Sequence, residues 1–563
     1  MKYHLAALIC GLIAATPALA EPVQDPATDS CEQSVYVPAP AGYDFTARVD
    51  RWGQGNTLPD LTGQEHVGKV YINTLPIFDP ADDDENNALY LFANRIHPDT
   101  RPVVIKDLIL FREGDVIDKR TAEESERILR SQAFLTDAAI RVVSRCHNAV
   151  DLEVIAKQSW TLVPEIKAKT SGGKSESGFG FHDSNFLGMG SRIAVAYARD
   201  IERNRILLHY DDGNFRGTRH ALKAHFEQNS DGFLRDVGYS LPFYALDTTN
   251  AWGVNVRSKK ALDYQWDLGE EVHDVQSQRK GIDAWIGTSR GLEDGVAHRR
   301  IYGIAYEDNV FTATPNTFGS LPPDRRLIYP YIEFQRIEDE YGVGYNINQI
   351  HRTEDLQLGR ALRARFGLSV VDDPWLVFEG RYFDTLRTRS RKLFQAELNW
   401  SGRWNLSNRK VEDTRIDLNL DYHLGQTDDR TLYLGLNVTD TWNLSVEKQV
   451  LLGGSNGMRG YPANFAAGRA SYRFTAEERL FTDYSLFALF NVGFVAFLDA
   501  GQVWQKGAPT TDVGFLSDAG LGIRLVPSKT EKLRVIHIDF GYPIRKVDGV
   551  TGGQILVEVK GTL

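Results

Sequence analysis

From about residue 160 onward, the chain alternates apolar and polar residues in many short runs. In RIDLNLDYHLG (415–425), even positions from Ile416 carry apolar side chains, while odd positions from Asp417 carry Asp, Asn and His. TLYLGLNV (431–438) and SRIAVAYAR (191–199) repeat this pattern. A period of two predicts β-strands with one apolar and one polar face. Polar turn clusters such as NSDG and LEDG separate the runs.

The length of this region favours a barrel. Residues 161–563 far exceed an ordinary β-sandwich of about 100 residues, although a sandwich also alternates. A propeller would need a blade-length repeat, which we do not find. A transmembrane antiparallel β-barrel, apolar outside and polar inside, fits the pattern best. The last run, QILVEVKGTL (554–563), suits closure against the first strand.

Residues 66–160 predict one small mixed domain of β-α-α-β-β order. Thr121 and Glu124 form a capping-box signature at the start of its second helix. The predicted elements are a strand at 68–78, helices at 103–111 and 121–131, and strands at 139–143 and 150–156.

The first twenty residues, MKYHLAALICGLIAATPALA, read as a secretory signal peptide. Residues 21–65 are rich in Pro and Gly and predict an extended leader. The acidic run at 82–85 predicts an exposed loop. After the signal, no run approaches the roughly 18 apolar residues of a spanning helix, so the chain is either a soluble periplasmic protein or a barrel.

Composition narrows the class of function. The net charge of −11 disfavours a nucleic-acid partner, because such proteins carry a basic face. Aromatic residues make up 11% of the chain, which suits the aromatic girdles of membrane barrels. Cys31 and Cys146 remain after the signal, in a compartment where disulfides persist. A Cys31–Cys146 disulfide and two free thiols both remain open.

Enzyme and cofactor motifs are not found. The sequence contains no GxSxG elbow, Walker loop or HExxH motif, and its 13 His residues are scattered singly. We therefore expect neither an enzyme nor a cofactor or metal site.

One soft segment interrupts the strands. GGSNGMRGYPANFAAG (453–468) holds a single cation, Arg459, among glycine and small residues. Alternation in the following strands places Glu477 and Asp499 on polar faces. A guanidinium that enters a barrel lumen would meet these carboxylates, and a bidentate Arg–carboxylate pair supplies both energy and geometry.

Four motifs near the C-terminus carry a family resemblance. MRGY (458–461), FLDAG (497–501), AGLGIRL (519–525) and IDFGYP (538–543) resemble the barrel of the BamA/TamA superfamily of outer-membrane assembly factors and two-partner secretion transporters. The domain at 66–160 then resembles a single POTRA domain, whereas the best-known members have several. The chain ends in Leu563 rather than the terminal aromatic common among such barrels.

The resemblance implies a mainly β protein with a 16-stranded barrel over 161–563 and a loop, 451–468, that folds into the lumen. Within that loop it implies an Arg459–Asp499 contact, flanked by Gly460 and Tyr461. The sequence contains closer to twenty alternating runs. We attribute the excess to boundary errors that divide one long strand into two runs. A barrel with more than 16 strands remains the alternative.

The expected function is that of a monomeric outer-membrane protein of a Gram-negative bacterium that inserts or translocates polypeptides. Its partners would be outer-membrane lipids and an unfolded client, which the periplasmic POTRA-like domain adds to a sheet edge. A passive pore or lipid-handling barrel is the alternative. The Arg459–Asp499 pair either acts in transport or only anchors the loop.

Overall fold

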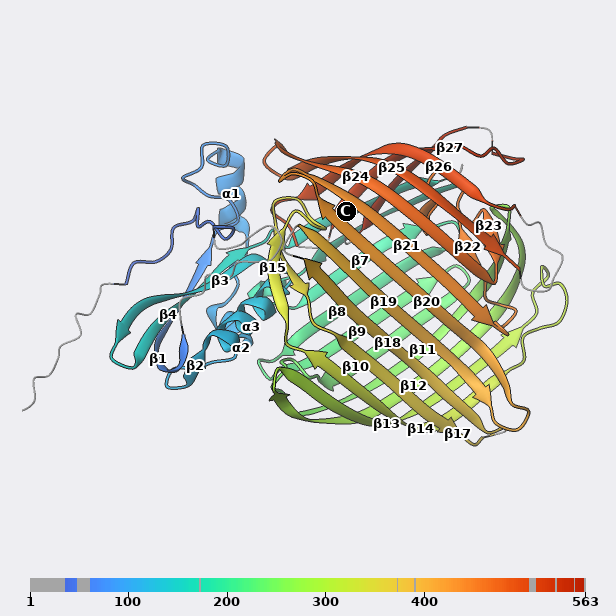
Figure 1. Cartoon of the computed structure of the whole chain (residues 1–563), viewed down its shortest axis with the longest axis horizontal. Helices are drawn as coiled ribbons and strands as arrows, with labels where there is room; N and C mark the ends of the chain where they lie inside the picture. The colour runs from blue at the N-terminus through green and yellow to red at the C-terminus, as the bar shows by residue number, and fades with distance from the viewer. Residues whose placement is uncertain are drawn as a thin grey trace, which may run out of the picture.

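The structure is a computed structural model, and a small mixed domain lies against one end of a large barrel (Figure 1). The expected signal peptide, most of the leader and the chain end at Leu563 lie outside the described residues. No helix of the described part is long and apolar enough to cross a membrane. The described residues are 36–47, 61–171, 174–371, 373–388, 391–505, 513–531, 534–550 and 552–560.

The small domain contains a four-stranded sheet in the order β2-β1-β4-β3. β1 runs parallel to β4, and the other pairs are antiparallel. The predicted order lacked α1 and β2, and β1 begins inside the expected leader. The elements are β1 (Thr62–Leu75), α1 (Ala88–Ile96), α2 (Pro102–Leu108), β2 (Val116–Asp118), α3 (Lys119–Arg130), β3 (Leu135–Cys146) and β4 (Ala149–Gln158).

Helix α3 begins earlier than its predicted capping box. Asp118 is the N-cap, and its carboxylate accepts a hydrogen bond from the Thr121 N–H at 2.7 Å. The Glu124 carboxylate instead accepts from the Leu246 N–H of a barrel turn at 2.8 Å. The capping-box prediction was wrong, because Asp118 already caps the helix and Glu124 binds the barrel.

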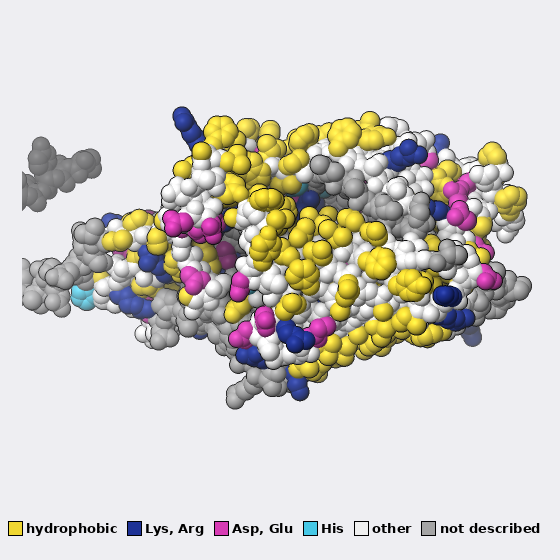
Figure 2. Space-filling model, turned by 90° about the horizontal axis from the view of Figure 1, so that it is seen from above, with side chains coloured by type: hydrophobic (Ala, Val, Ile, Leu, Met, Phe, Trp, Pro, Cys, Tyr) yellow, Lys and Arg dark blue, Asp and Glu magenta, His cyan; other side chains and the backbone are white. Residues whose placement is uncertain are grey.

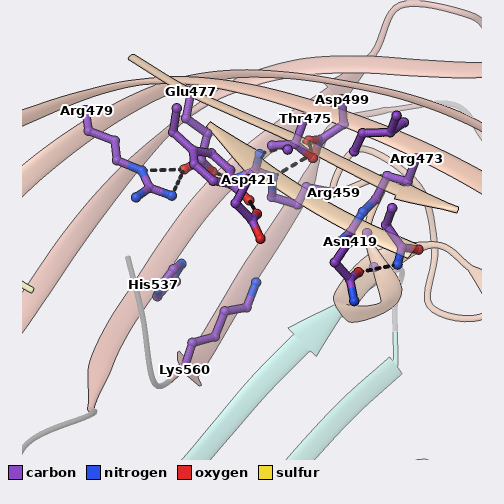
Figure 3. Close-up of a pocket in the computed structure, with 16 residues that line it drawn as sticks. Asn419, Asp421, Arg459, Arg473, Thr475, Glu477, Arg479, Asp499, His537 and Lys560 are labelled. Carbon is purple, nitrogen blue, oxygen red and sulfur yellow. Dashed lines mark hydrogen bonds and ion pairs between the residues drawn. The ribbon is translucent and has the colours of Figure 1, made fainter. Parts of the chain in front are cut away.

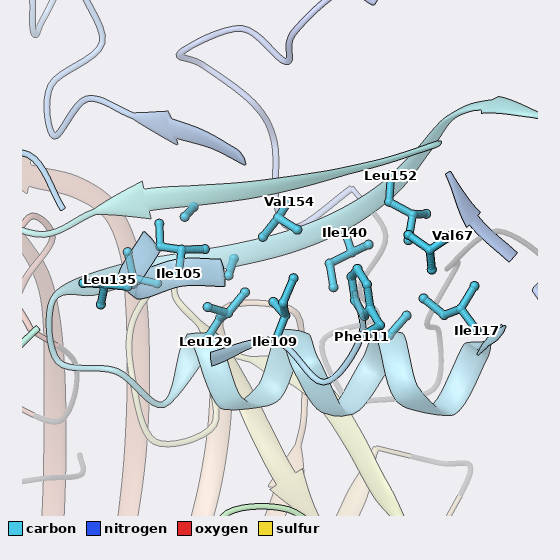
Figure 4. Close-up of a cluster of buried hydrophobic side chains, with 14 of the residues drawn as sticks. Val67, Ile105, Ile109, Phe111, Ile117, Leu129, Leu135, Ile140, Leu152 and Val154 are labelled. Carbon is cyan, nitrogen blue, oxygen red and sulfur yellow. The ribbon is translucent and has the colours of Figure 1, made fainter. Parts of the chain in front are cut away.

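The core of the small domain lies between one face of its sheet and the helices α2 and α3 (Figure 4). Ile105, Leu129 and Leu152 are fully buried there. The leader segment 36–47 crosses the opposite face of the sheet. There the Glu153 carboxylate accepts hydrogen bonds from the Ala39 N–H (2.9 Å) and from Asn73 Nδ2 (2.7 Å). Burial alone would raise the pKa of Glu153, but these hydrogen bonds lower it.

The large sheet closes into an antiparallel barrel. β15 (Tyr341–Tyr345) and β16 (Thr353–Gln357) form a separate hairpin, as do β22 (Val450–Leu452) and β23 (Ala466–Gly468). The barrel strands are β5 (Leu162–Ser171), β6 (Lys174–Asp183), β7 (Arg192–Arg199), β8 (Asn204–Phe215), β9 (His220–Asn229), β10 (Gly232–Leu241), β11 (Asn250–Asp267), β12 (Glu270–Glu293), β13 (Val296–Thr312), β14 (Arg325–Glu338), β17 (Ala361–Ser369), β18 (Trp375–Thr388), β19 (Lys392–Asn405), β20 (Lys410–Gly425), β21 (Arg430–Trp442), β24 (Ala470–Leu486), β25 (Phe490–Trp504), β26 (Leu516–Pro527), β27 (Val535–Pro543) and β28 (Gln554–Lys560).

The described barrel has 20 strands, not the 16 that the resemblance implied. β28 returns to β5 and closes the barrel, so the final strand takes the role predicted for it. The runs counted from alternation correspond to separate strands. The explanation that long strands had been split into several runs was therefore wrong. The alternative of an enlarged barrel is the one observed.

The two faces of the barrel follow the predicted alternation. Val195, Tyr197 and Ile555 point outward and are exposed, whereas the lumen-facing His423 and Asp499 are buried. Figure 2 shows hydrophobic side chains over much of the outer wall. An apolar exterior with a polar interior is the arrangement of a membrane barrel.

Leu152→Ala should destabilise the small domain by about 2–5 kcal/mol, because it leaves a cavity in a fully packed core. Hydrogen exchange of the β3 and β4 amides would measure the loss. Val116→Ala, at a side chain that is 55% exposed, is the control and should change stability by no more than about 0.5 kcal/mol. Equal protection in the two variants would contradict this packing.

Candidate functional site

The loop at 453–465 leaves the barrel wall between β21 and β24 and returns into the lumen. β22 and β23 pair at its base, and a short 3₁₀ turn, Gly454–Asn456, begins it. Gly453, Gly457 and Met458 have positive φ angles, which glycine tolerates best. The turns direct Arg459 toward the inner faces of β24 and β25 (Figure 3).

Arg459 lies among carboxylates with only 6% of its surface exposed. Its Nε and NH2 donate to the two carboxylate oxygens of Asp499 at 2.8 and 3.0 Å, and its NH1 donates to Glu477 at 2.8 Å. The Phe497 ring centroid lies 3.5 Å from the guanidinium carbon. Bidentate pairing together with ring stacking uses the planar guanidinium in a way that lysine could not reproduce.

A wider ion network surrounds this pair. Arg479 donates to the second oxygen of Glu477 at 2.9 Å, and Arg524 donates to Asp539 at 2.6 Å. Asp539 also lies 3.6 Å from the NH1 of Arg459. Arg479 therefore balances Glu477 of its own strand, and Arg524 balances Asp539 of the neighbouring strand. Buried ions require such pairing. A cavity of about 210 Å³ lies beside them.

Gly460 and Tyr461 fix the loop backbone against the wall. A Cβ at Gly460 would lie 2.6 Å from the Asp518 Cβ, so only glycine fits this approach. The Tyr461 ring is fully buried, and its hydroxyl donates to the Arg545 carbonyl at 2.7 Å. The hydroxyl also accepts from the Ser517 N–H at 3.2 Å.

The structure brings together all five residues that the sequence singled out around the loop: Arg459, Gly460, Tyr461, Glu477 and Asp499. It adds Asp539, Arg524 and Phe497, which were not named as partners. Each of these lies in one of the quoted motifs. Alternation within IDFGYP and AGLGIRL could have found Asp539 and Arg524 as lumen-facing charges.

The thiol of Cys146, at the end of β3, is in a disulfide. Cys31, its candidate partner, lies outside the described residues, so that pairing remains a prediction.

A second element, unforeseen from the sequence, lies at the barrel end that faces the small domain. The β15–β16 hairpin arises between β14 and β17 and reaches β24, five places from β17 in the strand order. There the Ile347 carbonyl accepts from Arg479 at 3.3 Å, and the Ile350 carbonyl accepts from Asn491 at 3.0 Å. The Glu354 carboxylate holds the tip by accepting from the Asn348 N–H at 3.0 Å. The hairpin therefore crosses the mouth of the barrel.

Helix α3 of the small domain binds this hairpin. Arg130 donates to both carboxylate oxygens of Asp355, from Nε at 2.9 Å and from NH2 at 2.6 Å. One turn earlier, the guanidinium of Arg127 lies 3.7 Å from the Tyr341 ring centroid. Contacts thus run from α3 through the hairpin to Arg479, and from Arg479 through Glu477 to Arg459.

The opposite end of the barrel is bridged as well. The main-chain N–H of Trp266, beside the β11–β12 turn, donates to the side-chain oxygen of Gln449 at 2.8 Å, just before β22. Gln449 returns a bond to the Trp266 carbonyl at 3.1 Å. Lys174, from the β5–β6 turn, lies 4.7 Å from the same ring. The base of the loop is therefore tied to the far wall.

Comparison with known families bears on this part of the barrel. Residues 394–558 match the Omp85 superfamily domain. The chain carries an Omp85 superfamily domain. The resemblance drawn from the four motifs is confirmed, and the barrel is of the outer-membrane type. Comparison with curated proteins finds no significant match.

Solved structures with a similar chain trace include CdiB from Escherichia coli, at 12% identity, with a TM-score of 0.47 and coverage of 89% of this chain and 77% of that one. BamA from Haemophilus ducreyi lacking POTRA domains 1–3 is also 12% identical, with a TM-score of 0.38 and coverage of 88% and 84%. At this level the likeness assigns no function to any residue, and the family assignment rests on the match at 394–558.

Glu477→Gln should weaken the seating of the loop. It removes one partner of a buried ion network, a change that costs about 3–5 kcal/mol when a charge is left uncompensated. When samples are heated to increasing temperatures before electrophoresis, the band of the folded form should disappear at a lower temperature. Trypsin should also cut after Arg459.

The neighbouring Glu478→Gln is the matched control. Glu478 faces outward and pairs with the exposed Arg430 at 3.0 Å, and exposed pairs contribute about 0–1 kcal/mol. Equal unfolding temperatures for the two variants would show that the network does not hold the loop.

Proposed function

We propose that the protein inserts or translocates polypeptides at the outer membrane, with the small domain in the periplasm as the receiver of an unfolded client. The observation that carries the proposal is the contact path from α3, through the β15–β16 hairpin and Arg479, to the loop held by Arg459. The Omp85 domain supports the same role. A passive pore would need no such link between a receiving domain and a lumen loop.

The edge strand β3 is the proposed client site. Among the described strands, β3 pairs only with β4. On its other edge, α3 binds the first half of the strand, since Glu126 accepts from the Ile140 N–H and Arg130 donates to the Ala138 carbonyl. The part of β3 after Ile140 is therefore the segment that we propose accepts another strand. Main-chain hydrogen bonds along such an edge bind extended segments with little dependence on sequence. This suits an unfolded client whose identity varies.

The β15–β16 hairpin is the proposed gate at the periplasmic mouth. Arg130 and Asp355 join it to α3, and Arg479 joins it to the loop site. A displacement of α3 on client binding would pull on the hairpin and remove the Ile347 carbonyl from Arg479. Arg479 also orients Glu477, so the same displacement would loosen Arg459. The Arg459 pair then acts as a latch within the transport cycle.

Cells that lack the protein should contain less of at least one outer-membrane or secreted protein. Quantitative proteomics of outer membranes and culture medium would measure this, with the wild-type gene and the Glu477→Gln variant restored separately. Wild type should restore the level, whereas Glu477→Gln should restore it only in part. Unchanged levels of every such protein in the deletion strain would favour the passive pore or lipid-handling alternative.

Arg130→Ala should raise the open probability of the barrel in planar bilayers. It removes the bidentate contact to Asp355, at a cost of about 3 kcal/mol, or roughly a hundredfold in the equilibrium between seated and displaced hairpin. Lys119→Ala is the matched control, because Lys119 also lies on α3 but pairs with Glu123 of the same helix at 3.7 Å. Identical conductance traces for the two variants would refute the gate.

A further inference from the structure

Helix α1 of the small domain presents its apolar side outward. Leu89, Phe92 and Ile96 are 69%, 57% and 55% exposed, and their spacing of three and four residues places them on one face. No residue of this helix is buried. A helix on a protein in water normally shows the reverse orientation, with its apolar stripe against the core.

The orientation is held by specific contacts on the other side of the helix. The Asn94 side chain accepts from the Phe78 N–H at 3.0 Å and donates to the Phe78 carbonyl at 2.8 Å. The Tyr90 ring stacks on the Phe78 ring, with centroids 4.3 Å apart. Asn87 caps the N-terminus by accepting from the Tyr90 N–H at 3.1 Å. The helix is thus fixed with its apolar stripe facing away from the domain.

The barrel rim beside α1 is apolar too. The Tyr90 hydroxyl donates to the carbonyl of Phe487, in the β24–β25 turn. Phe487 and Tyr484 are 73% and 62% exposed. Strand β25 runs from that turn along the barrel wall, and its side chains Phe494 and Leu498 are also exposed on the outside. Helix α1 is therefore attached to a rim from which exposed apolar side chains lead into the outer wall of the barrel. Figure 2 shows hydrophobic side chains over this upper side of the barrel.

The loop before α1 ties it to the same rim. The acidic run was predicted to be exposed, and residues 82–84 are, but Glu85 is buried and pairs with Lys529 of the β26–β27 turn. Figure 1 shows α1 beside the barrel end that carries the small domain, with its axis across the length of the barrel. A helix in that position would lie parallel to the plane of a surrounding membrane.

We propose that α1 is an interfacial helix that binds the periplasmic leaflet of the membrane around the barrel, with Leu89, Phe92 and Ile96 among the upper acyl chains. Short amphipathic helices bind bilayers in this way, with the apolar face sunk to the headgroup boundary. The partner is a phospholipid surface rather than a protein, because α1 is bound to the rim of a wall that already faces lipid. Arg95, exposed in the last turn, lies where it can meet headgroup phosphates.

A second part of the rim supports a lipid surface. The β6–β7 turn exposes Leu187 and Met189 at 58% and 40%. The Gly188 carbonyl of this turn accepts from the Arg101 N–H of the small domain at 3.0 Å. The small domain thus touches the barrel at two apolar turns on either side of the β28–β5 closure, and α1 would hold it level with the membrane there.

The test uses the full chain in nanodiscs of phosphatidylethanolamine and phosphatidylglycerol, with an environment-sensitive fluorophore on Phe92→Cys. Emission should shift to the blue and be quenched by lipids that carry a doxyl group near the headgroup. Val37→Cys, on the leader segment across the outer sheet face and 70% exposed, is the matched control and should show neither change. The unsubstituted protein gives the labelling background.

A second variant separates lipid contact from protein contact. Leu89→Ser with Ile96→Ser in the Phe92→Cys background should abolish the quenching and leave heat-modifiable migration unchanged. A blue shift without quenching would mean that a protein covers the stripe, and an unshifted emission would mean that water does. Either result overturns the proposal. The inference rests on the outer-membrane setting of the proposed function but needs no client, so each can fail without the other.

Discussion

The guanidinium of Arg459 is a full charge held away from water, and the C-terminal half of the barrel is arranged around it. A buried charge is tolerated only when it is paired and hydrogen-bonded. Glu477, Asp499 and Asp539 come from three different strands, β24, β25 and β27. Their carboxylates can converge only if the strands keep one register, in which Thr475 faces Asp499 across the ladder. The ion pair, the register and the path of the loop therefore depend on one another.

Glu477 has a special position in this arrangement because two arginines share it. One oxygen accepts from Arg459 and the other from Arg479, so the loop and the hairpin meet at a single side chain. Coupling between distant sites requires an element that has two discrete arrangements, with an equilibrium that each of the two sites can shift. In the gate that we propose, the β15–β16 hairpin is that element, since it is attached to the small domain by Arg130 and to the wall by main-chain carbonyls. The remaining barrel strands have no comparable freedom, because each is paired along both edges.

Local alternation predicted the faces of the barrel strands and, through them, the partners of Arg459. Asp499 and Glu477 could be placed in the lumen because the side-chain period of a strand is two everywhere. The hairpin could not be foreseen. Arg130 and Asp355 are 225 residues apart, and no periodic pattern links them. Helix α1 was missed because it is nine residues long, follows an acidic loop and buries nothing. The predicted strand number was wrong for a different reason. We followed the family resemblance, which implied 16 strands, over the count of alternating runs in the sequence, which was closer to twenty.

Helix α1 and the barrel wall place their apolar side chains by the same rule. Apolar side chains belong where water is excluded, and in a membrane protein that region includes the outer shell as well as the core. The wall strands expose Phe494 and Leu498 for this reason. Helix α1 exposes Leu89, Phe92 and Ile96 at the same rim. Its inner face uses Asn94 and Tyr90 to bind the domain by hydrogen bonds and stacking, contacts that leave the apolar stripe free. The reversed amphipathicity is then a consequence of the solvent, because the helix meets lipid on the side where a helix of a soluble domain would meet water.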